Sequence, residues 1–310
     1  MEQQLDYAAV RAAAARTAGA VRPAAVVPAS EGVWYALEYL QHTGSFKARG
    51  AHNFLAAHRE AGRLPAAGVT IASGGNAGLA CAWAARAHGI PATVFLPGNA
   101  PRVKVDRLRG YGADVRLVGD RYDQALAACR EFAAGSGALS SHAYDHPLVA
   151  AGAGTLLDEV RAALPGLDAV VVAVGGGGLF AGVATAAREH GVRVVAAEPE
   201  HCRALNAALE AGEPVDVPVA SVAADSLGAT RVSADALAAA LAAARNADAL
   251  SVLVPDEAIT AARRALWDEH RIVVENGAAT ALAALRTTPE PLGEKVAVVL
   301  CGANTDPGDL

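Results

Sequence analysis

The chain has 310 residues and a net charge of −6, with 53% apolar and 19% charged residues. At about 150 residues per domain, this length predicts two domains with a large apolar core, and the composition excludes a disordered, collagen-like or coiled-coil protein. The acidic balance argues against a nucleic-acid or anionic-membrane partner, so a small-molecule substrate is the first expectation.

The cysteines and the first residues indicate a reducing, cytoplasmic setting. The four cysteines lie far apart and form no CxxC pair, which excludes a zinc ribbon and a thioredoxin-like redox site. The N-terminal MEQQLDYAAV is polar and acidic, unlike a secretion signal. Residues 169–187 carry no charge, but the central GGGG predicts a buried strand, a turn and a helix in place of a membrane span. We therefore expect no membrane partner.

Short runs rich in Val and Ile alternate with Ala-rich stretches along the chain. The predicted strands are Thr70–Ala72, Ala92–Leu96, Asp114–Val118, Ala169–Val174, Arg193–Ala197 and Val296–Cys301. The predicted helices are Ala77–His88, Arg102–Tyr111, Arg121–Ala134, Thr155–Leu164, Phe180–His190 and the Ala-rich segment Ala234–Asn246. This alternation predicts an α/β protein with helix-covered parallel sheets, whose strands are buried on both faces. The irregular stretch Gly135–Pro147 is a plausible crossing between domains.

The segment TGSFKARGA, residues 43–51, carries the first candidate group. Ser45 is a natural N-cap, so the following helix would hold Lys47 in its first turn. The helix dipole and the apolar neighbour Phe46 would then lower the pKa of the Lys47 ammonium. A lysine in this position can act as a neutral amine and form a Schiff base, and the alternative is an exposed lysine on a helix surface.

A glycine-containing turn, Ser73-Gly74-Gly75-Asn76, follows the first predicted strand. Successive backbone N–H groups in such a turn, with a helix N-terminus behind them, form a nest suited to a carboxylate. The alternative is an ordinary turn whose glycines only permit tight geometry.

A second glycine turn, Gly175–Gly178, joins a buried strand to a helix and favours a phosphate site. Gly176, Gly178 and Ala181, with Glu198 about twenty residues later, also match the dinucleotide-binding fingerprint. An NAD-dependent oxidoreductase is therefore an alternative at this point.

The last candidate segment is VAVVLCGANTDP, residues 296–307. Here Cys301 ends a predicted strand, which would place its thiol at the carboxyl edge of a sheet, where ligands of α/β proteins bind. The alternative is a small buried core cysteine.

In this order, the four segments resemble the tryptophan-synthase-like, fold type II pyridoxal-phosphate enzymes, and among them the L-serine/L-threonine dehydratases. The family's S-x-K-x-R-G-A, S-x-G-N, glycine-loop and CGG-N-like segments are present as residues 45–51, 73–76, 175–178 and 301–304. Cysteine synthases are also similar, but they typically carry K-D-R after the lysine and T-S-G-N-T-G later. The chain departs from the pattern at Glu275-Asn276, where Glu-Pro is frequent, and at Ala303, where glycine is usual.

The resemblance implies a two-domain, three-layer αβα architecture with parallel or mixed sheets and the cofactor cleft between the domains. The large domain would comprise residues 1–40 and 142–310, and the small inserted domain residues 41–141. The residues implied to hold pyridoxal phosphate are Phe46, Lys47, Asn76, Gly175, Gly176, Gly177, Gly178, Gly228 and Cys301. Those implied to hold the substrate carboxylate are Ser73, Gly74, Asn76 and Ala77.

The implied reaction is β-elimination from L-serine or L-threonine to a 2-oxo acid and ammonia, with Lys47 as the catalytic base. Cys301 would face the pyridine nitrogen, where a neutral thiol is a weak donor, and this favours elimination over transamination. Other fold type II activities, β-replacement and racemisation, are alternatives. Gly74 argues against racemisation, since the resembling serine racemases carry a serine base two residues before the motif asparagine.

The resemblance also implies a monovalent cation such as K⁺ and a homodimer. The cation ligands would be the carboxylate of Glu198 and the backbone carbonyls of Cys202, Ala204, Leu227 and Ala229. A single carboxylate with several carbonyls suits a singly charged ion. The alternative is that Glu198 pairs with a surface arginine.

Overall fold

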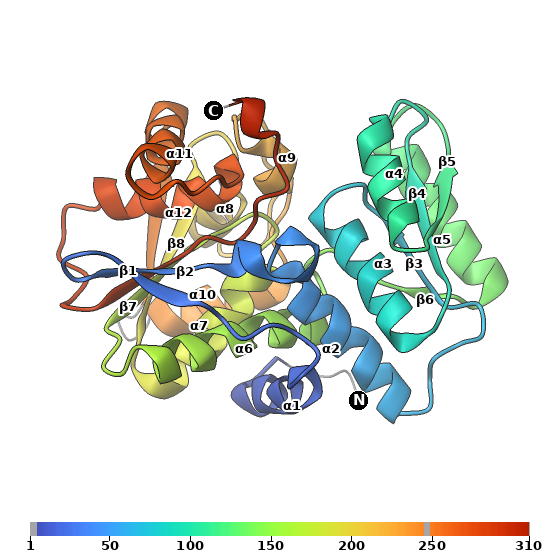
Figure 1. Cartoon of the computed structure of the whole chain (residues 1–310), viewed down its shortest axis with the longest axis horizontal. Coiled ribbons are helices and arrows are strands. Elements are labelled where there is room, and N and C mark those ends of the chain that lie inside the picture. The colour runs from blue at the N-terminus through green and yellow to red at the C-terminus, as the bar shows by residue number, and fades with distance from the viewer. Residues whose placement is uncertain (1–4, 245–248, 310) are drawn as a thin grey trace.

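The computed structural model describes residues 5–244 and 249–309, which form two sheets covered by helices. The larger sheet has the order β1-β2-β10-β7-β8-β9, and the smaller sheet has the order β5-β4-β3-β6. Figure 1 shows the two sheets in separate parts of the molecule, with helix α2 between them. In the larger sheet β1 pairs with β2 antiparallel, and the other described pairings in both sheets are parallel. The predicted α/β class with parallel and mixed sheets is confirmed.

The strands are β1 (Val26–Ser30), β2 (Val33–Ala36), β3 (Val69–Ala72), β4 (Ala92–Leu96), β5 (Asp114–Leu117), β6 (Leu139–Ser140), β7 (Ala169–Ala173), β8 (Arg193–Pro199), β9 (Ala249–Val254) and β10 (Val296–Val299). The α-helices are α1 (Tyr7–Thr17), α2 (Lys47–Glu60), α3 (Asn76–His88), α4 (Arg102–Gly110), α5 (Tyr122–Ser136), α6 (Pro147–Ala163), α7 (Gly178–His190), α8 (Ala204–Ala211), α9 (Ala224–Leu227), α10 (Ala234–Ala244), α11 (Asp256–His270) and α12 (Asn276–Thr287). Short 3-10 helices are η1 (Glu38–Leu40), η2 (His42–Gly44) and η3 (Pro307–Asp309).

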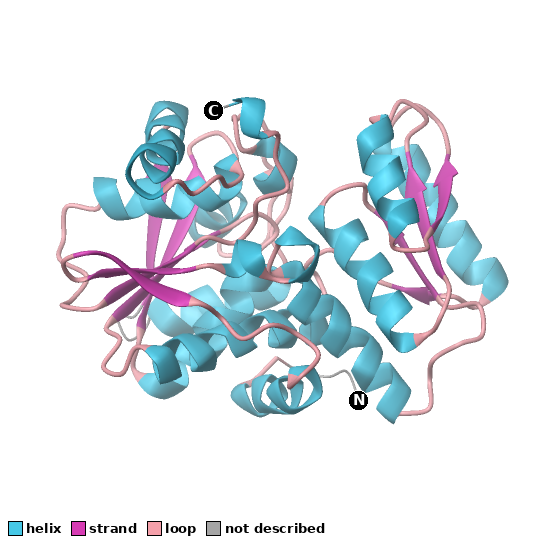
Figure 2. Ribbon diagram, in the orientation of Figure 1, coloured by secondary structure: helices cyan, strands magenta, loops and turns pink. Residues whose placement is uncertain are grey.

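The larger sheet forms the main core because its central strands are apolar on both faces. Every residue of β7 and β10 is buried, and helices lie on both sides of the sheet in Figure 2. Helices α6 and α7 meet at Gly154 and Gly182, where the backbones approach too closely for a Cβ atom. This close crossing holds α7, and with it the glycine turn before α7, at the carboxyl end of β7.

Tertiary context changes several predicted elements. Strand β5 is largely exposed, contrary to prediction, because it lies at the edge of the smaller sheet. Helix α6 begins at Pro147 and not at Thr155, since a proline is well tolerated in the first turn of a helix. The strand before Cys301 ends at Val299. The predicted helix Ala234–Asn246 is present as α10, and its last two residues lie outside the described residues.

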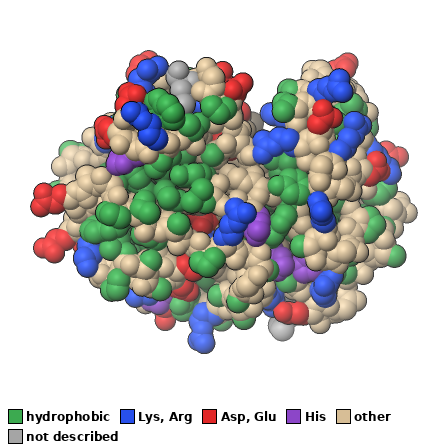
Figure 3. All heavy atoms as spheres, in the orientation of Figure 1, with side chains coloured by type: hydrophobic (Ala, Val, Ile, Leu, Met, Phe, Trp, Pro, Cys, Tyr) green, Lys and Arg blue, Asp and Glu red, His purple; other side chains and the backbone are tan. Residues whose placement is uncertain are grey.

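The smaller sheet lies wholly within residues 69–140, inside the predicted small domain 41–141. The domain limits themselves stay a prediction. In the described residues, no helix is long and apolar enough to cross a membrane. Figure 3 shows the surface hollowed between the two parts at the top of this view.

Candidate active site

Lys47 is the first residue of α2, as the sequence predicts, but Ser45 does not cap the helix. Ser45 has extended backbone, and its buried Oγ has no hydrogen-bond partner. The segment instead pairs with the chain after β10: Ser45 forms a bridge with Gly302, and the Phe46 N–H donates to the Cys301 carbonyl at 3.0 Å. The prediction of a Ser45 cap is wrong because this pairing takes the backbone away from the cap geometry. The same pairing places Lys47 next to Cys301.

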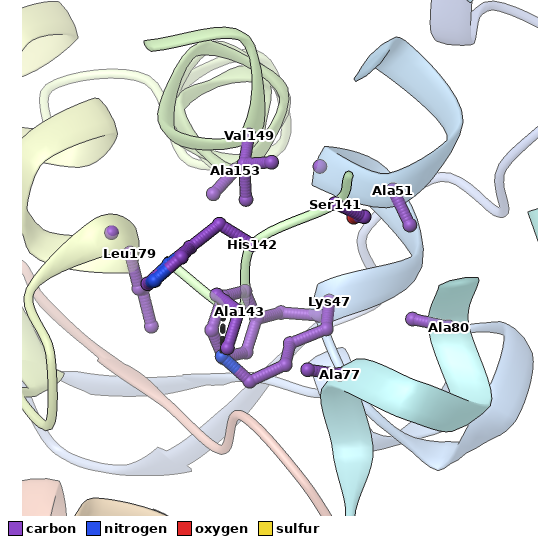
Figure 4. A pocket seen from close by; sticks show the side chains of 13 residues that line it. Lys47, Ala51, Ala77, Ala80, Ser141, His142, Ala143, Val149, Ala153 and Leu179 are labelled. Carbon is purple, nitrogen blue, oxygen red and sulfur yellow. Dashed lines mark hydrogen bonds between the residues drawn. The ribbon is translucent and has the colours of Figure 1, made fainter. Parts of the chain in front are cut away.

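The Lys47 amine lies in a pocket between α2, α3 and the segment 141–143, shown in Figure 4. Its Nζ donates to the Ala143 carbonyl at 3.1 Å and lies 4.8 Å from the centroid of the Phe46 ring. Burial lowers the pKa of the Lys47 ammonium, while the nearby Cys301 and Glu275 act against this shift. The pKa shift of Lys47 therefore has the predicted direction, and burial is its largest cause.

Cys301 offers a neutral thiol in the same region. Burial raises its pKa to about 12, and the neighbouring Glu275 acts in the same direction. A thiol in this state neither attacks as a nucleophile nor carries a charge at neutral pH. Cys301 is therefore suited to a neutral contact with a ligand atom, which is the role the resemblance implies.

Asn76 is the first residue of α3, and its side chain bonds to two residues that sequence reasoning did not select. Its Nδ2 donates to both carboxylate oxygens of Glu275, at 2.9 and 3.0 Å. Its Oδ1 accepts from Asn304 Nδ2 at 2.5 Å. Glu275 is 3% exposed, and burial raises the pKa of its carboxyl. The sequence signals for these partners are indirect: Glu275-Asn276 departs from the family's Glu-Pro, and Asn304 is the asparagine of the CGG-N-like segment.

The turn before α3 lies beside the pocket of Lys47 and is packed at Gly74 but open at Gly75. Ala77 lines the pocket of Lys47. Ser73 Oγ accepts from the Gly75 N–H at 3.4 Å, and a Cβ on Gly74 would come within 2.9 Å of Leu96 Cδ2. The structure thus brings Lys47, Asn76 and Ala77 together, with the Ser73–Gly74 turn directly before them.

The glycine turn Gly175–Gly178 precedes α7, and Gly178 lines the same pocket as Lys47. Gly177 has a φ of 92°, a left-handed conformation that a side chain disfavours. The ring of Tyr144 packs directly over Gly176, and its hydroxyl donates to the Arg231 carbonyl at 3.2 Å. Because Gly176 has no side chain, the Tyr144 ring can lie directly against its backbone.

The segment after α9 reaches the other side of the glycine turn. A Cβ on Gly175 would lie 3.2 Å from Leu227 Cα, and Gly228 follows directly as the C-cap of α9. The segment that carries Gly228 therefore lies beside the glycine turn, and a role of Gly228 in holding the cofactor stays a prediction.

Glu198, the predicted cation ligand, lies at the end of β8 and is fully buried. Its carboxylate accepts from the N–H groups of Leu205 and Asn206 in the first turn of α8, at 2.7 and 2.8 Å. Burial raises its pKa to about 7. The carboxylate therefore bonds to the first turn of α8. Among the described residues, no three His, Cys, Asp or Glu side chains could together hold a metal ion.

Comparisons with known proteins identify the family of this chain. The sequence profile of the family described as "Pyridoxal-phosphate dependent enzyme" matches residues 12–302. The chain is 39% identical over 281 residues to the L-threonine ammonia-lyase of Geobacter sulfurreducens, a match that covers 88% of this chain and 67% of that protein. It is 40% identical over 260 residues to the serine dehydratase-like protein of Mus musculus, covering 82% and 76%.

Among solved structures, maize serine racemase superposes with a TM-score of 0.90 at 27% identity, covering 99% of this chain and 96% of the racemase. The family profile spans Lys47, Asn76, the Gly175–Gly178 turn and Cys301. The chain therefore belongs to the pyridoxal-phosphate dependent enzyme family.

Proposed function

We propose that this protein is an ammonia-lyase that converts L-serine or L-threonine into a 2-oxo acid and ammonia with pyridoxal phosphate as its cofactor. The observation that carries the proposal is the amine of Lys47, which burial shifts toward its neutral form beside the neutral thiol of Cys301. The ammonia-lyase and dehydratase names of the relatives at 39% and 40% identity support the same reaction.

The residues present fit pyridoxal phosphate. Lys47 supplies a buried amine, and Cys301 supplies a neutral partner close to it. The glycines of the Gly175–Gly178 turn leave the backbone accessible, and the Tyr144 ring packs against it. The turn directly precedes α7, a helix of 13 residues. Such a helix start attracts a phosphate through its free N–H groups. The Gly175–Gly178 turn would hold the phosphate.

Each site residue then has a role. Lys47 would hold the cofactor, Asn76 would bind its ring oxygen, Cys301 would contact its ring nitrogen, and Gly175–Gly178 would bind its phosphate. Phe46 and Gly228 would lie near the ring. The turn formed by Ser73, Gly74, Asn76 and Ala77 would bind the carboxylate of the substrate. The bound cofactor supplies an electron sink that stabilises a carbanion at the substrate Cα.

Lys47 would also act as the catalytic base. A neutral amine can take the proton from the substrate Cα, whereas an ammonium cannot, so the lowered pKa of Lys47 serves this step. The apolar residues around it, including Ala77, Ala80 and Leu179, exclude water from the amine. The neutral Cys301 cannot hold a proton firmly on the ring nitrogen as a carboxylate would, which favours loss of the β-hydroxyl over transamination.

Racemisation is the second candidate, because a serine racemase is among the similar structures. It needs a second acid or base on the opposite side of Cα from Lys47. At the position two residues before Asn76 this chain has Gly74, which has no side chain to supply one. We therefore infer that elimination predominates.

We further propose a K⁺ site at Glu198 with the carbonyls of Cys202, Ala204, Leu227 and Ala229, and a cytoplasmic homodimer. The buried carboxylate of Glu198 at a strand end supports the cation site. Activity that is equal in K⁺ and in a tetramethylammonium buffer would contradict it. A monomer mass by light scattering at assay concentration would contradict the dimer.

The experiment that tests the lyase measures 2-oxo acid formed from L-serine and from L-threonine by the purified protein with pyridoxal phosphate. We expect turnover with at least one of them and none in Lys47→Ala. Lys104→Ala is the matched control, because Lys104 is exposed on α4. Turnover retained in Lys47→Ala, or none in the wild type with either amino acid, contradicts the proposal.

A further inference from the structure

A closed hydrogen-bond network surrounds the Asn76 side chain. Its Nδ2 donates to both oxygens of Glu275, and its Oδ1 accepts from Asn304 Nδ2. The backbone N–H of Asn304 also donates to Glu275 Oε1, at 2.7 Å. A carboxylate can only accept and the Asn304 amide nitrogen can only donate, so the Asn76 amide can take one orientation and not the flipped one.

Two glycines provide the room for this network. A Cβ on Gly302 would lie 2.9 Å from Glu275 Oε1, and a Cβ on Gly44 would lie 2.9 Å from Asn304 Oδ1. Gly44 also has a φ of 77°, which favours glycine. Asn304 Nδ2 donates in addition to the Thr43 carbonyl, at 2.8 Å. The backbone just before Lys47, at Gly44, therefore packs against Asn304. The backbone just after Cys301, at Gly302, packs against Glu275.

The network also joins the two parts of the molecule. Asn76 begins α3, which packs with the smaller sheet, whereas Glu275 and Asn304 lie before α12 and after β10. From α4, on the side of the smaller sheet, the exposed Arg107 donates to Asn304 Oδ1. Asn304 thus receives a second contact from that side of the molecule.

We propose that Glu275 and Asn304 are positioning residues that fix the side-chain amide of Asn76 so that it presents an N–H group, and not its oxygen, to the ring oxygen of the cofactor. This inference rests on the proposed role of Asn76 in the lyase. An amide nitrogen has two N–H donors, so one remains after the bonds to Glu275. The oxygen is already used by Asn304. A donor stabilises negative charge on the ring oxygen, whereas an amide oxygen would repel it.

The inference predicts what happens when the network is broken. In Glu275→Gln, one carboxylate oxygen becomes an NH₂ group, and since both oxygens accept from Asn76 Nδ2, this NH₂ group faces an N–H donor of Asn76 in either orientation. The Asn76 amide then turns or loses its partner. In Asn304→Ala, the acceptor Oδ1 of Asn76 loses its donor, and either amide orientation becomes available. Losing the charge-assisted bond to Glu275 should weaken cofactor binding by about 10- to 100-fold, and losing the neutral bond to Asn304 by about 3- to 10-fold.

The experiment titrates each purified apoprotein with pyridoxal phosphate and records the dissociation constant and the absorbance spectrum at saturation. We expect Glu275→Gln to raise the dissociation constant about 10- to 100-fold and Asn304→Ala to raise it about 3- to 10-fold. We also expect a changed ratio of the absorbance bands of the bound cofactor, which a purely structural defect would not alter once binding is saturated. Arg107→Ala should show a smaller change of the same kind, and Arg109→Ala, an exposed arginine on the same helix, should match the wild type.

Dissociation constants within about twofold of the wild type, with unchanged spectra in the folded variants, would overturn the inference. If Glu275→Gln does not fold, Asn304→Ala and the exposed Arg107→Ala decide by the same two readouts. Neither readout depends on turnover. A wild type that binds the cofactor but forms no 2-oxo acid refutes the lyase proposal, and the amide-orientation inference is still decided by the binding data.

Discussion

Arg49, two residues after Lys47, holds the start of α2 through a buried ion cluster whose loss should destabilise the protein strongly. Its guanidinium is fully buried and donates to both oxygens of Glu38, each at 2.8 Å. It also donates to both oxygens of Glu159, at 2.7 and 2.8 Å, and to Thr155 Oγ1 at 3.1 Å. Glu38 is 1% exposed, so Arg49 supplies the charge that balances a carboxylate without access to water.

We expect Arg49→Met to lower the free energy of unfolding by about 3–5 kcal/mol, the usual result of removing one partner of a buried pair. At about 2 °C per kcal/mol for a chain of this size, this corresponds to a fall in Tm of about 6–10 °C. Arg49→Lys keeps the charge but loses the paired N–H groups, so its loss should be intermediate. Adding Glu38→Gln to Arg49→Met should recover about 2 kcal/mol, because the uncompensated charge is gone.

The assay is urea unfolding at pH 7.5, followed by circular dichroism, for the four proteins and for the control Arg188→Met. Arg188 is exposed near the end of α7, and its replacement should change the free energy of unfolding by less than about 0.5 kcal/mol. A loss below about 1 kcal/mol in Arg49→Met would refute the reasoning. So would a double variant as unstable as the single one, since Arg49 and Glu38 would then not be coupled.

Three further predictions follow from the structure. Burial lowers the pKa of His88 to about 4, so the unfolded chain binds more protons and stability falls as the pH drops from about 6.5 to 4. His88→Leu should therefore reduce the fall in Tm over this pH range. The variant is compared with the wild type because the raised pKa of Glu198 acts in the opposite direction. Gly182→Ala should lower Tm because its Cβ would overlap the Ala150 carbonyl oxygen. Gly135→Ala, in open space on α5, should keep or raise Tm. Equal Tm values for the two variants would contradict the packing argument. Gly74→Ser should increase D-serine formed from L-serine, followed by chiral chromatography, and an unchanged D-serine to pyruvate ratio would count against this side-chain role.

The features that sequence predicted well are those set by local pattern. The apolar run that became β7, the glycine turn after it and the lysine at the start of α2 each follow from neighbouring residues. Their chemistry could be inferred because a strand, a turn and a helix that follow one another directly place their side chains and N–H groups in a known local geometry.

The features that sequence missed depend on contacts between distant segments. Ser45 has the residue type of a cap, yet its backbone pairs with Gly302. The exposure of β5 depends on its place at a sheet edge, which its own residues do not reveal. Glu275 gains its importance only from Asn76, 199 residues away. A local pattern contains no signal for such a partner.

The central claim is that Lys47 holds pyridoxal phosphate, and one measurement tests it directly. The protein is loaded with the cofactor, reduced with borohydride, digested and examined by peptide mass spectrometry. The chain has three lysines, of which Lys104 is exposed and Lys295 donates to the Pro165 carbonyl at 2.7 Å. We predict a pyridoxyl phosphate adduct on the peptide that contains Lys47, and a protein that loses its colour on reduction. An adduct confined to the peptides of Lys104 or Lys295, or no adduct, would contradict the account.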